Sequence, residues 1–221
     1  MTATQCPPSR AAELGSLYHF LELALAHPGE DGFDYFRRPE TEHELARLLS
    51  GHLPRHAGPP LADFFGGLRK ATFEEVEAAY ISLFSANFPQ VPCPPYGSLF
   101  TAEDDGKRLE EMLAIKAFYA ENGVDVSESF DDLPDHLCVE LEFLQLLCFR
   151  EHDAAAAGDA ELAAALRGRQ AVFLDRFVLP FMERLAALAA KFDADNPYSH
   201  LLDATRLLLT DHRSHLGECL P

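Results

Sequence analysis

One long helix is predicted by the stretch DDLPDHLCVELEFLQLLCFREH, which runs from Asp131 to His152. Its acidic residues and early proline suit the first turn of a helix, and Arg150 suits the negative end of the helix dipole. The positions expected to face a core recur at three- and four-residue steps and are Leu137, Leu141, Leu144 and Cys148. The stretch therefore predicts a helix with one buried face, and the flanking sequence repeats the pattern.

Upstream of this stretch, two further long helices are predicted by the same spacing. The first spans residues 10–27 and the second spans residues 72–87. Thr72 and Glu75 have the spacing of a capping box, in which each side chain binds the backbone N–H of the other residue. Residues 29–67 are interrupted by Gly and Pro and predict short helices and loops.

A third upstream helix is predicted to be capped by Thr101, which is followed by three acidic residues. It is expected to close at Glu121–Gly123, where Asn-Gly suits a helix end. Its predicted inward residues are Leu109, Met112, Leu113 and Ala117.

Downstream, Asp159 is expected to open a helix that is punctuated by Pro180, and a last helix is expected to begin around Asn196–Pro197. No strand pattern of period two appears. The prediction is an all-α protein with one compact helical domain at residues 10–209. Residues 1–9 are interpreted as a flexible leader and residues 210–221 as a flexible tail.

Composition restricts the possible partners. The 221 residues carry 18 Lys and Arg against 36 Asp and Glu, a formal net charge of −18. Such a surface repels nucleic acid and anionic lipid and attracts a short basic peptide, less strongly as salt rises. The five cysteines show no CxxC pair, which favours a reducing compartment. No apolar leader or membrane-span pattern is found, so a cytoplasmic protein without stable membrane insertion is expected.

The first candidate site is a Pro-rich loop between central helices, FPQVPCPPYGSLF, at residues 88–100. Its prolines impose extended backbone and prevent a helix through Tyr96. Two interpretations are open. The loop is either a rigid connector or the preformed edge of a peptide groove, with Tyr96, Ser98 and Phe100 offering ring and hydroxyl contacts.

The second candidate site is the pair Asp135–His136 with Glu140 and Glu142. On one helix, His136 and Glu140 share a face, so the carboxylate would orient the imidazole and raise its pKa. Asp135 at the helix N-terminus would remain ionised and could accept an arginine. The alternative is a first-turn acid followed by an ordinary surface pair.

Enzyme chemistry finds little support in the sequence. The nucleophile-elbow, P-loop and dinucleotide-binding motifs are all missing. The remaining alternative is an all-α metal-dependent enzyme that uses the His136/Glu140 cluster. The terminal residues His212, His215 and Cys219 could contribute ligands if they were helical, but a flexible tail is favoured. No resident cofactor is expected.

Three motifs in one order resemble the TorD/DmsD/NarJ family of redox-enzyme maturation chaperones. They are YxxLF at residues 80–84, CPPYGS at residues 93–98, and LPDHL followed by ELEF at residues 133–143. The likeness spans roughly residues 10–209. The chain departs from many relatives in having Gly97, where an acidic residue often precedes the serine, and in having no tryptophan.

The resemblance implies a cytoplasmic, all-helical assembly chaperone rather than an enzyme. Its partner would be the precursor catalytic subunit of a molybdopterin-containing oxidoreductase, often bound through a twin-arginine leader peptide, and it would support cofactor insertion and delay export. The carried-over peptide-binding residues are Tyr96, Ser98, Asp135, His136, Glu140 and Glu142. A monomer or a domain-swapped dimer is expected.

Overall fold

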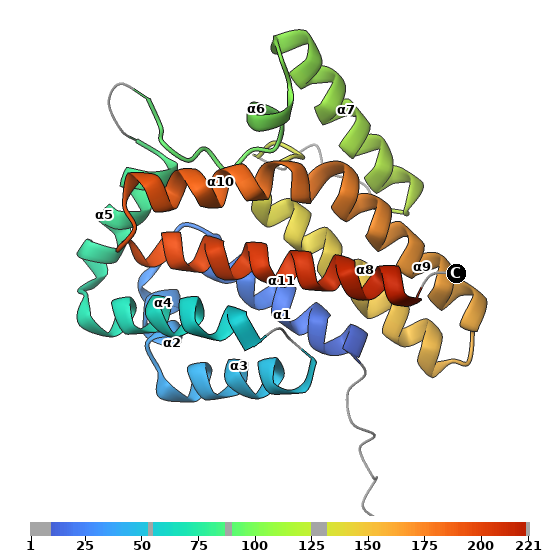
Figure 1. Cartoon of the computed structure of the whole chain (residues 1–221), viewed down its shortest axis with the longest axis horizontal. Helices are drawn as coiled ribbons and strands as arrows, with labels where there is room; N and C mark the ends of the chain where they lie inside the picture. The colour runs from blue at the N-terminus through green and yellow to red at the C-terminus, as the bar shows by residue number, and fades with distance from the viewer. Residues whose placement is uncertain (1–9, 53–54, 87–89, 125–131, 220–221) are drawn as a thin grey trace, which may run out of the picture.

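The computed structural model describes residues 10–52, 55–86, 90–124 and 132–219, and helices connected by loops make up nearly all of them (Figure 1). Within these residues the only strand-like pairing is a single bridge between Tyr96 and His136. The all-α prediction is confirmed. The predicted leader, residues 1–9, lies outside the described residues.

The helices of the N-terminal half are α1 (Arg10–Leu25), α2 (Glu30–Phe36), α3 (Pro39–His52), α4 (Gly58–Lys70), α5 (Phe73–Phe84), α6 (Ser98–Thr101) and α7 (Asp105–Glu121), with a 3-10 turn at Arg55–Ala57. Those of the C-terminal half are α8 (Leu137–Ala156), α9 (Ala160–Phe173), α10 (Leu179–Phe192) and α11 (Pro197–Cys219). A π-helical turn at Leu174–Val178 joins α9 to α10, and Pro180 lies in the first turn of α10.

The core lies where helices distant in sequence meet. Helix α1 packs mainly against α8, and α11 packs between α10 and α4, as Figure 1 shows. At the end of the bundle next to α7, aromatic rings form one buried cluster. The centroid of Phe173 lies 4.7 Å from that of Phe143 and 5.5 Å from that of Phe118. This cluster fixes the inner face of α7 against α8 and α9.

Several predicted helix ends agree with the structure. The capping box at α5 is present in both directions, because the Thr72 side chain accepts from the Glu75 N–H and the Glu75 carboxylate accepts from the Thr72 N–H. Asp159 caps α9, and α11 begins at Pro197. Each helix cap depends on residues within one turn, so it can be predicted from the sequence alone.

The prediction for α7 was wrong about both its start and its inward face. Its cap is Asp104, whose carboxylate accepts from the Lys107 N–H at 2.8 Å. Leu109 and Leu113 are 55% and 58% exposed, whereas the buried residues are Ile115, Phe118 and Tyr119. Both sets have helical spacing, and the aromatic cluster decides between them, because large rings bury more surface than leucines.

Substitutions on α7 should therefore distinguish its two faces. Leu109→Gln and Leu113→Gln are expected to change the free energy of unfolding by less than about 0.5 kcal/mol, as exposed positions do. Ile115→Ala, on the buried face, should cost about 2–5 kcal/mol. Urea unfolding followed by circular dichroism measures both. A large loss for the leucine variants would mean that this face is covered in solution.

Two further boundaries differ from the prediction. Helix α8 begins at Leu137 instead of near Asp131, because the backbone just before it pairs with the Pro-rich loop. The expected flexible tail from residue 210 is helical as far as Cys219, and Leu216 is buried on α11. One buried leucine and one buried histidine, His212, hold this last part of the helix against the bundle. Within the described residues, no helix combines the length and the apolar composition that a membrane span needs.

Candidate functional site

The site is organised by a short antiparallel contact between the Pro-rich loop and the segment before α8. The Leu137 N–H donates to the Pro95 carbonyl at 2.9 Å, and the Gly97 N–H donates to the Asp135 carbonyl at 2.9 Å. Prolines keep the loop extended, and the buried Cys93 ties it to α5 through a bond from its N–H to the Leu83 carbonyl. We call this contact the backbone bridge.

Two pockets adjoin the backbone bridge and share no lining residue. The acidic pocket has a volume of about 540 Å³ and is lined by residues that include Glu22, Tyr96, Asp132, His136, Cys138 and Glu142. The Asp135 pocket has a volume of about 210 Å³ and is lined by residues that include Gly97, Ser98, Glu111, Asp135, Glu140 and Arg176. Asp135 lies in a turn closed by a bond from the His136 N–H to the Leu133 carbonyl, and His136 follows with extended backbone; the two side chains line different pockets.

The six peptide-binding residues expected from the sequence are therefore divided between two places. Tyr96, His136 and Glu142 line the acidic pocket. The other three, Ser98, Asp135 and Glu140, line the Asp135 pocket. Their roles in binding stay a prediction, and each pocket combines residues from both candidate sites.

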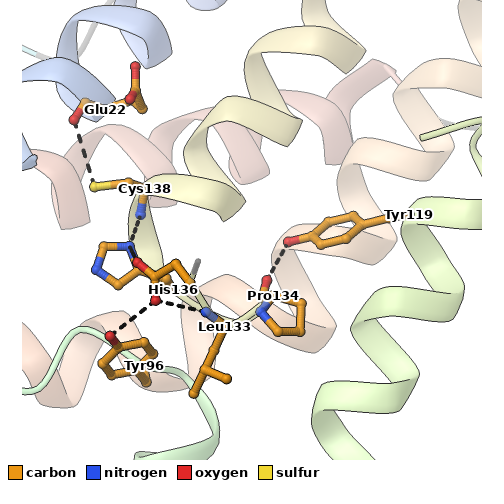
Figure 2. A network of polar contacts seen from close by, with 8 residues as sticks. Glu22, Tyr96, Tyr119, Leu133, Pro134, His136 and Cys138 are labelled. Carbon is orange, nitrogen blue, oxygen red and sulfur yellow. Dashed lines mark hydrogen bonds and ion pairs between the residues drawn. The ribbon is translucent and has the colours of Figure 1, made fainter. Parts of the chain in front are cut away.

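A polar network holds the wall of the acidic pocket (Figure 2). The Tyr96 hydroxyl donates to Asp132 at 3.1 Å, and the Tyr96 and His136 rings meet edge to face with centroids 5.1 Å apart. His136 caps α8, because its Nδ1 accepts from the Cys138 N–H at 3.2 Å. Burial lowers the pKa of His136, although the nearby Asp132 and Asp135 oppose this shift. The imidazole is thus a neutral acceptor at neutral pH.

The expected pairing of His136 with Glu140 is wrong. The two side chains line different pockets, and the pKa of His136 is shifted down by burial instead of up by Glu140. The sequence argument placed both residues on one helix, whereas His136 precedes α8 with extended backbone. Asp132, whose Oδ2 lies 3.8 Å from His136 Nδ1, is the carboxylate that accompanies the imidazole.

The acidic pocket has the electrostatics of a cation-binding surface. Three of its lining residues are carboxylates, Glu22, Asp132 and Glu142, and no Lys or Arg of the described chain lines it. Burial raises the pKa of Glu22, and the negative charge of Glu142 adds to this shift while His19 opposes it. Burial also raises the pKa of the Cys138 thiol to about 12, so this sulfur is not a nucleophile at neutral pH.

An apolar pocket of about 460 Å³ adjoins the acidic pocket, because Ala26 and His27 line both. Its further lining comes from α1, α2, α4, α5 and α11 and includes Leu23, Phe33, Tyr35, Phe36, Phe64 and Tyr198. Leu23 and Tyr35 are 44% and 41% exposed, so part of the apolar surface is accessible. The sequence analysis did not predict this pocket, because each of its apolar residues has the helical spacing of an ordinary core residue.

The Asp135 pocket is unusual in its unpaired polar atoms. The Ser98 N–H donates to Asp135 Oδ2 at 2.9 Å. Three other buried oxygens have no hydrogen-bond partner in the structure: Ser98 Oγ, Asp135 Oδ1 and Glu140 Oε2. A buried polar atom left unpaired costs about 1–3 kcal/mol, so three in one pocket are a feature that needs explaining.

The two residues on which the metal-enzyme alternative depends, His136 and Glu140, line different pockets. Among the described residues, no group of three or more His, Cys, Asp or Glu side chains has the arrangement of a metal site. His212 is buried and its Nδ1 lies 2.7 Å from the Tyr18 hydroxyl, which satisfies it within the core. The side chain of Cys219 lies outside the described residues.

Comparisons with known proteins add an independent finding. Residues 53–187 match the family model described as nitrate reductase delta subunit. The chain is 35% identical to the selenate reductase assembly chaperone protein of Thauera selenatis, over 68% of this chain and 75% of that protein. It is 30% identical to the chlorate reductase assembly chaperone protein of Ideonella dechloratans, over 66% of this chain and 72% of that protein.

Longer but weaker likenesses cover nearly the whole chain. The dimethyl sulfide dehydrogenase assembly chaperone protein of Rhodovulum sulfidophilum is 27% identical over 95% of this chain and 83% of its own. A solved structure described as a redox enzyme maturation protein of Archaeoglobus fulgidus superposes with a TM-score of 0.53 and 21% identity, over 95% of this chain and 99% of its own. That structural likeness concerns the fold alone.

Proposed function

Because the chain belongs to the nitrate reductase delta subunit family, we propose that it is an assembly chaperone and not an enzyme. Its proposed partner is the immature catalytic subunit of a molybdopterin-containing oxidoreductase. It would hold that subunit in the cytoplasm during cofactor insertion and delay its export. The curated relatives named above, each an assembly chaperone of an oxidoreductase, support this proposal.

We further propose that the chain binds the twin-arginine leader of its partner. This proposal rests on the continuity of the acidic and apolar pockets through Ala26 and His27. A twin-arginine leader has adjacent arginines followed by an apolar stretch. The arginines would lie near Glu22, Asp132 and Glu142, and the apolar stretch would cover Leu23 and Tyr35. Burial of apolar surface would supply affinity, and the carboxylates would supply orientation and faster association.

Substitutions in the acidic pocket and in the apolar pocket should change leader affinity with different dependence on salt. Asp132→Asn combined with Glu142→Gln should weaken binding of a synthetic leader peptide by about tenfold at low salt, because each lost charge removes attraction to an arginine. This difference from wild type should shrink as the ionic strength rises from about 0.05 to 0.5 M. Leu23→Ser should also weaken binding, but by a factor that salt leaves nearly unchanged. Fluorescence anisotropy with a labelled leader measures the affinity of wild type and of both variants.

A matched control is the double substitution Asp105→Asn and Glu110→Gln. It removes the same two charges from exposed positions on α7 and should leave leader affinity almost unchanged. If this control lost as much affinity as the pocket variant, attraction would come from net charge alone. If the wild-type chain did not bind the leader, the leader site would be excluded, and a pull-down with the mature catalytic subunit would test the chaperone role separately.

A further inference from the structure

A row of basic residues runs along the exposed face of one continuous helix. Helices α9 and α10 and the π-helical turn between them form an uninterrupted helix from Ala160 to Phe192, as Figure 1 shows. The row consists of Arg169, Arg176, Arg184 and Lys191, and all four residues are exposed. We call it the basic stripe. At about 1.5 Å per residue, the stripe is about 33 Å long.

The members of the basic stripe recur once every two turns of the helix. The steps between neighbouring members are seven, eight and seven residues. Two turns of an α-helix take about 7.2 residues, and the π-helical turn takes more residues than an α-helical turn. Neighbouring charges therefore lie about 10–11 Å apart along the helix axis, on one side of the helix.

The carboxylates next to the basic stripe are committed to another helix. Asp175 and Glu183 each precede a stripe residue in the sequence, but both form ion pairs with arginines of α11. Asp175 Oδ1 lies 2.7 Å from Arg213 Nε. Glu183 Oε2 lies 3.6 Å from Arg206 Nη1. These two acids therefore leave the charges of the stripe uncompensated.

The contacts that the stripe residues make are with neutral groups. Arg184 donates to the Phe100 carbonyl. The Arg176 guanidinium lies 4.8 Å from the centroid of the Phe177 ring. Within the described residues, none of the four stripe residues forms an ion pair. The stripe thus presents four positive charges in line on a chain whose net charge is −18.

A second row of exposed residues runs beside the basic stripe, and its side chains are small or apolar. Its members also recur at steps of seven or eight residues and are Ala165, Val172, Pro180 and Ala187. Val172 is 50% exposed although it is apolar. Short side chains let a second helix approach to the usual interaxial distance of about 8–10 Å, while the longer basic side chains reach its flank.

We propose that the basic stripe docks an acidic amphipathic helix of a partner protein. Carboxylates that recur every two turns on that helix would meet the four cations, and arginine pairs with a carboxylate through two parallel bonds. The apolar row of the partner helix would cover Val172 and the small residues beside it. The residues of α9 and α10 line neither the acidic nor the apolar pocket, so the inference does not rest on the leader proposal.

The spacing and the net charge both favour this occupant over other acidic partners. A second helix repeats a side chain on one face at the interval of the stripe, whereas an extended strand returns to the same face after about 6.6 Å. A long polyanion such as nucleic acid meets the net charge of −18 as well as the stripe, and that charge repels it. A short acidic helix contacts the stripe alone.

The probe is a labelled synthetic helix of about 28 residues, or four heptads, with glutamate at every seventh position and alanine and leucine beside it. The comparison peptide has the same composition, but its glutamates are spread around all faces of the helix. Fluorescence anisotropy with the full chain should show the first peptide binding at least about tenfold tighter than the second. Arg169→Gln combined with Lys191→Gln should weaken binding of the first peptide about tenfold.

A matched control removes one arginine and one lysine elsewhere. Arg38→Gln combined with Lys70→Gln changes exposed positions among the N-terminal helices and should alter the affinity less than about twofold. Circular dichroism should be the same for both double variants and wild type. The proposal is overturned if the control loses as much affinity as the Arg169/Lys191 variant, or if the two peptides bind equally well.

Photo-crosslinking in the cell tests the natural occupant. Benzoyl-phenylalanine in place of Val172 should cross-link the full chain to a protein segment whose acidic residues recur every seven positions. Adding the Arg169/Lys191 substitutions should reduce the yield at least about fivefold. A cross-link from Val172 to nucleic acid, to lipid or to a twin-arginine leader would overturn the proposal.

A second crosslinking position separates this inference from the leader groove. Benzoyl-phenylalanine in place of Tyr35 lies in the apolar pocket and reports on the leader. A leader cross-link at Tyr35 without an acidic segment at Val172 would exclude the docking helix and leave the chaperone role standing. An acidic segment at Val172 without a leader at Tyr35 would support the basic stripe and count against the leader proposal alone.

Discussion

Replacing Phe173 by alanine is expected to lower the free energy of unfolding by about 3–5 kcal/mol. The Phe173 side chain is fully buried, and its ring meets those of Phe143, Phe177 and Phe118 at centroid distances of 4.7, 5.4 and 5.5 Å. Alanine would leave a cavity that rigid neighbouring rings cannot fill, and it would remove the ring contacts that hold α7 against the bundle. Urea unfolding measured by circular dichroism gives the difference.

The neighbouring residue provides the control. Val172 is 50% exposed on the same helix, so Val172→Ala should change stability by less than about 0.5 kcal/mol. A comparable loss in both variants would mean that the aromatic cluster does not account for the effect of Phe173→Ala. A small loss for Phe173→Ala would mean that the rings repack around the missing side chain.

Acid should destabilise the protein through His212. This residue is 1% exposed, and burial, with help from the positive Arg10 and His215, lowers the pKa of His212 to about 3. The Tyr18 hydroxyl lies 2.7 Å from His212 Nδ1, and burial favours the neutral imidazole in the folded chain. Since the unfolded imidazole has a pKa of about 6.5, this stability is present above that pH and is lost as the pH falls toward 3.

The expected slope from this one group approaches about 1.4 kcal/mol per pH unit below pH 6 or so. His212→Gln keeps an acceptor for Tyr18 but does not titrate, so its unfolding free energy should fall less steeply with acid than that of wild type. His27→Gln, at a half-exposed position two residues beyond the end of α1, should retain the wild-type slope. Parallel curves for wild type and His212→Gln would show that His212 is accessible to protons in the folded state.

Local sequence signals predicted the start of several helices correctly. Thr72 with Glu75, Asp159, and Pro197 each begin a helix as expected, because a cap depends only on residues within one turn. The all-α class followed from the spacing of apolar residues along the whole chain. These features need no knowledge of which helices touch.

Features that depend on distant contacts could not be predicted. Helix α8 starts six residues later than expected because Asp135 and Leu137 bond to Gly97 and Pro95, some 40 residues away. The inward face of α7 is chosen by rings on other helices. The final turns of α11 were expected to be flexible because of Gly217, but burial of Leu216 and His212 holds them.

The candidate site could likewise be predicted only in part, because it also depends on distant contacts. The sequence identified the Pro-rich loop and the segment around Asp135 as special, and the structure brings them together at the backbone bridge. Helical geometry was assumed for His136, so it was paired with Glu140, which lines the other pocket. The apolar pocket was missed because it draws on five separate helices, and only their packing exposes Leu23 and Tyr35 beside the carboxylates.

The pairing of α1 with α8 has a consequence for how the chain comes off the ribosome. Helix α8 begins about 110 residues after α1 ends, so the apolar face of α1 has no partner during most of synthesis. Helix α4 likewise waits for α11, which begins about 127 residues after α4 ends. Contacts between such distant segments form slowly, because a long loop must close first. The nascent chain therefore exposes its own unfinished core until α8 and α11 have both been synthesised.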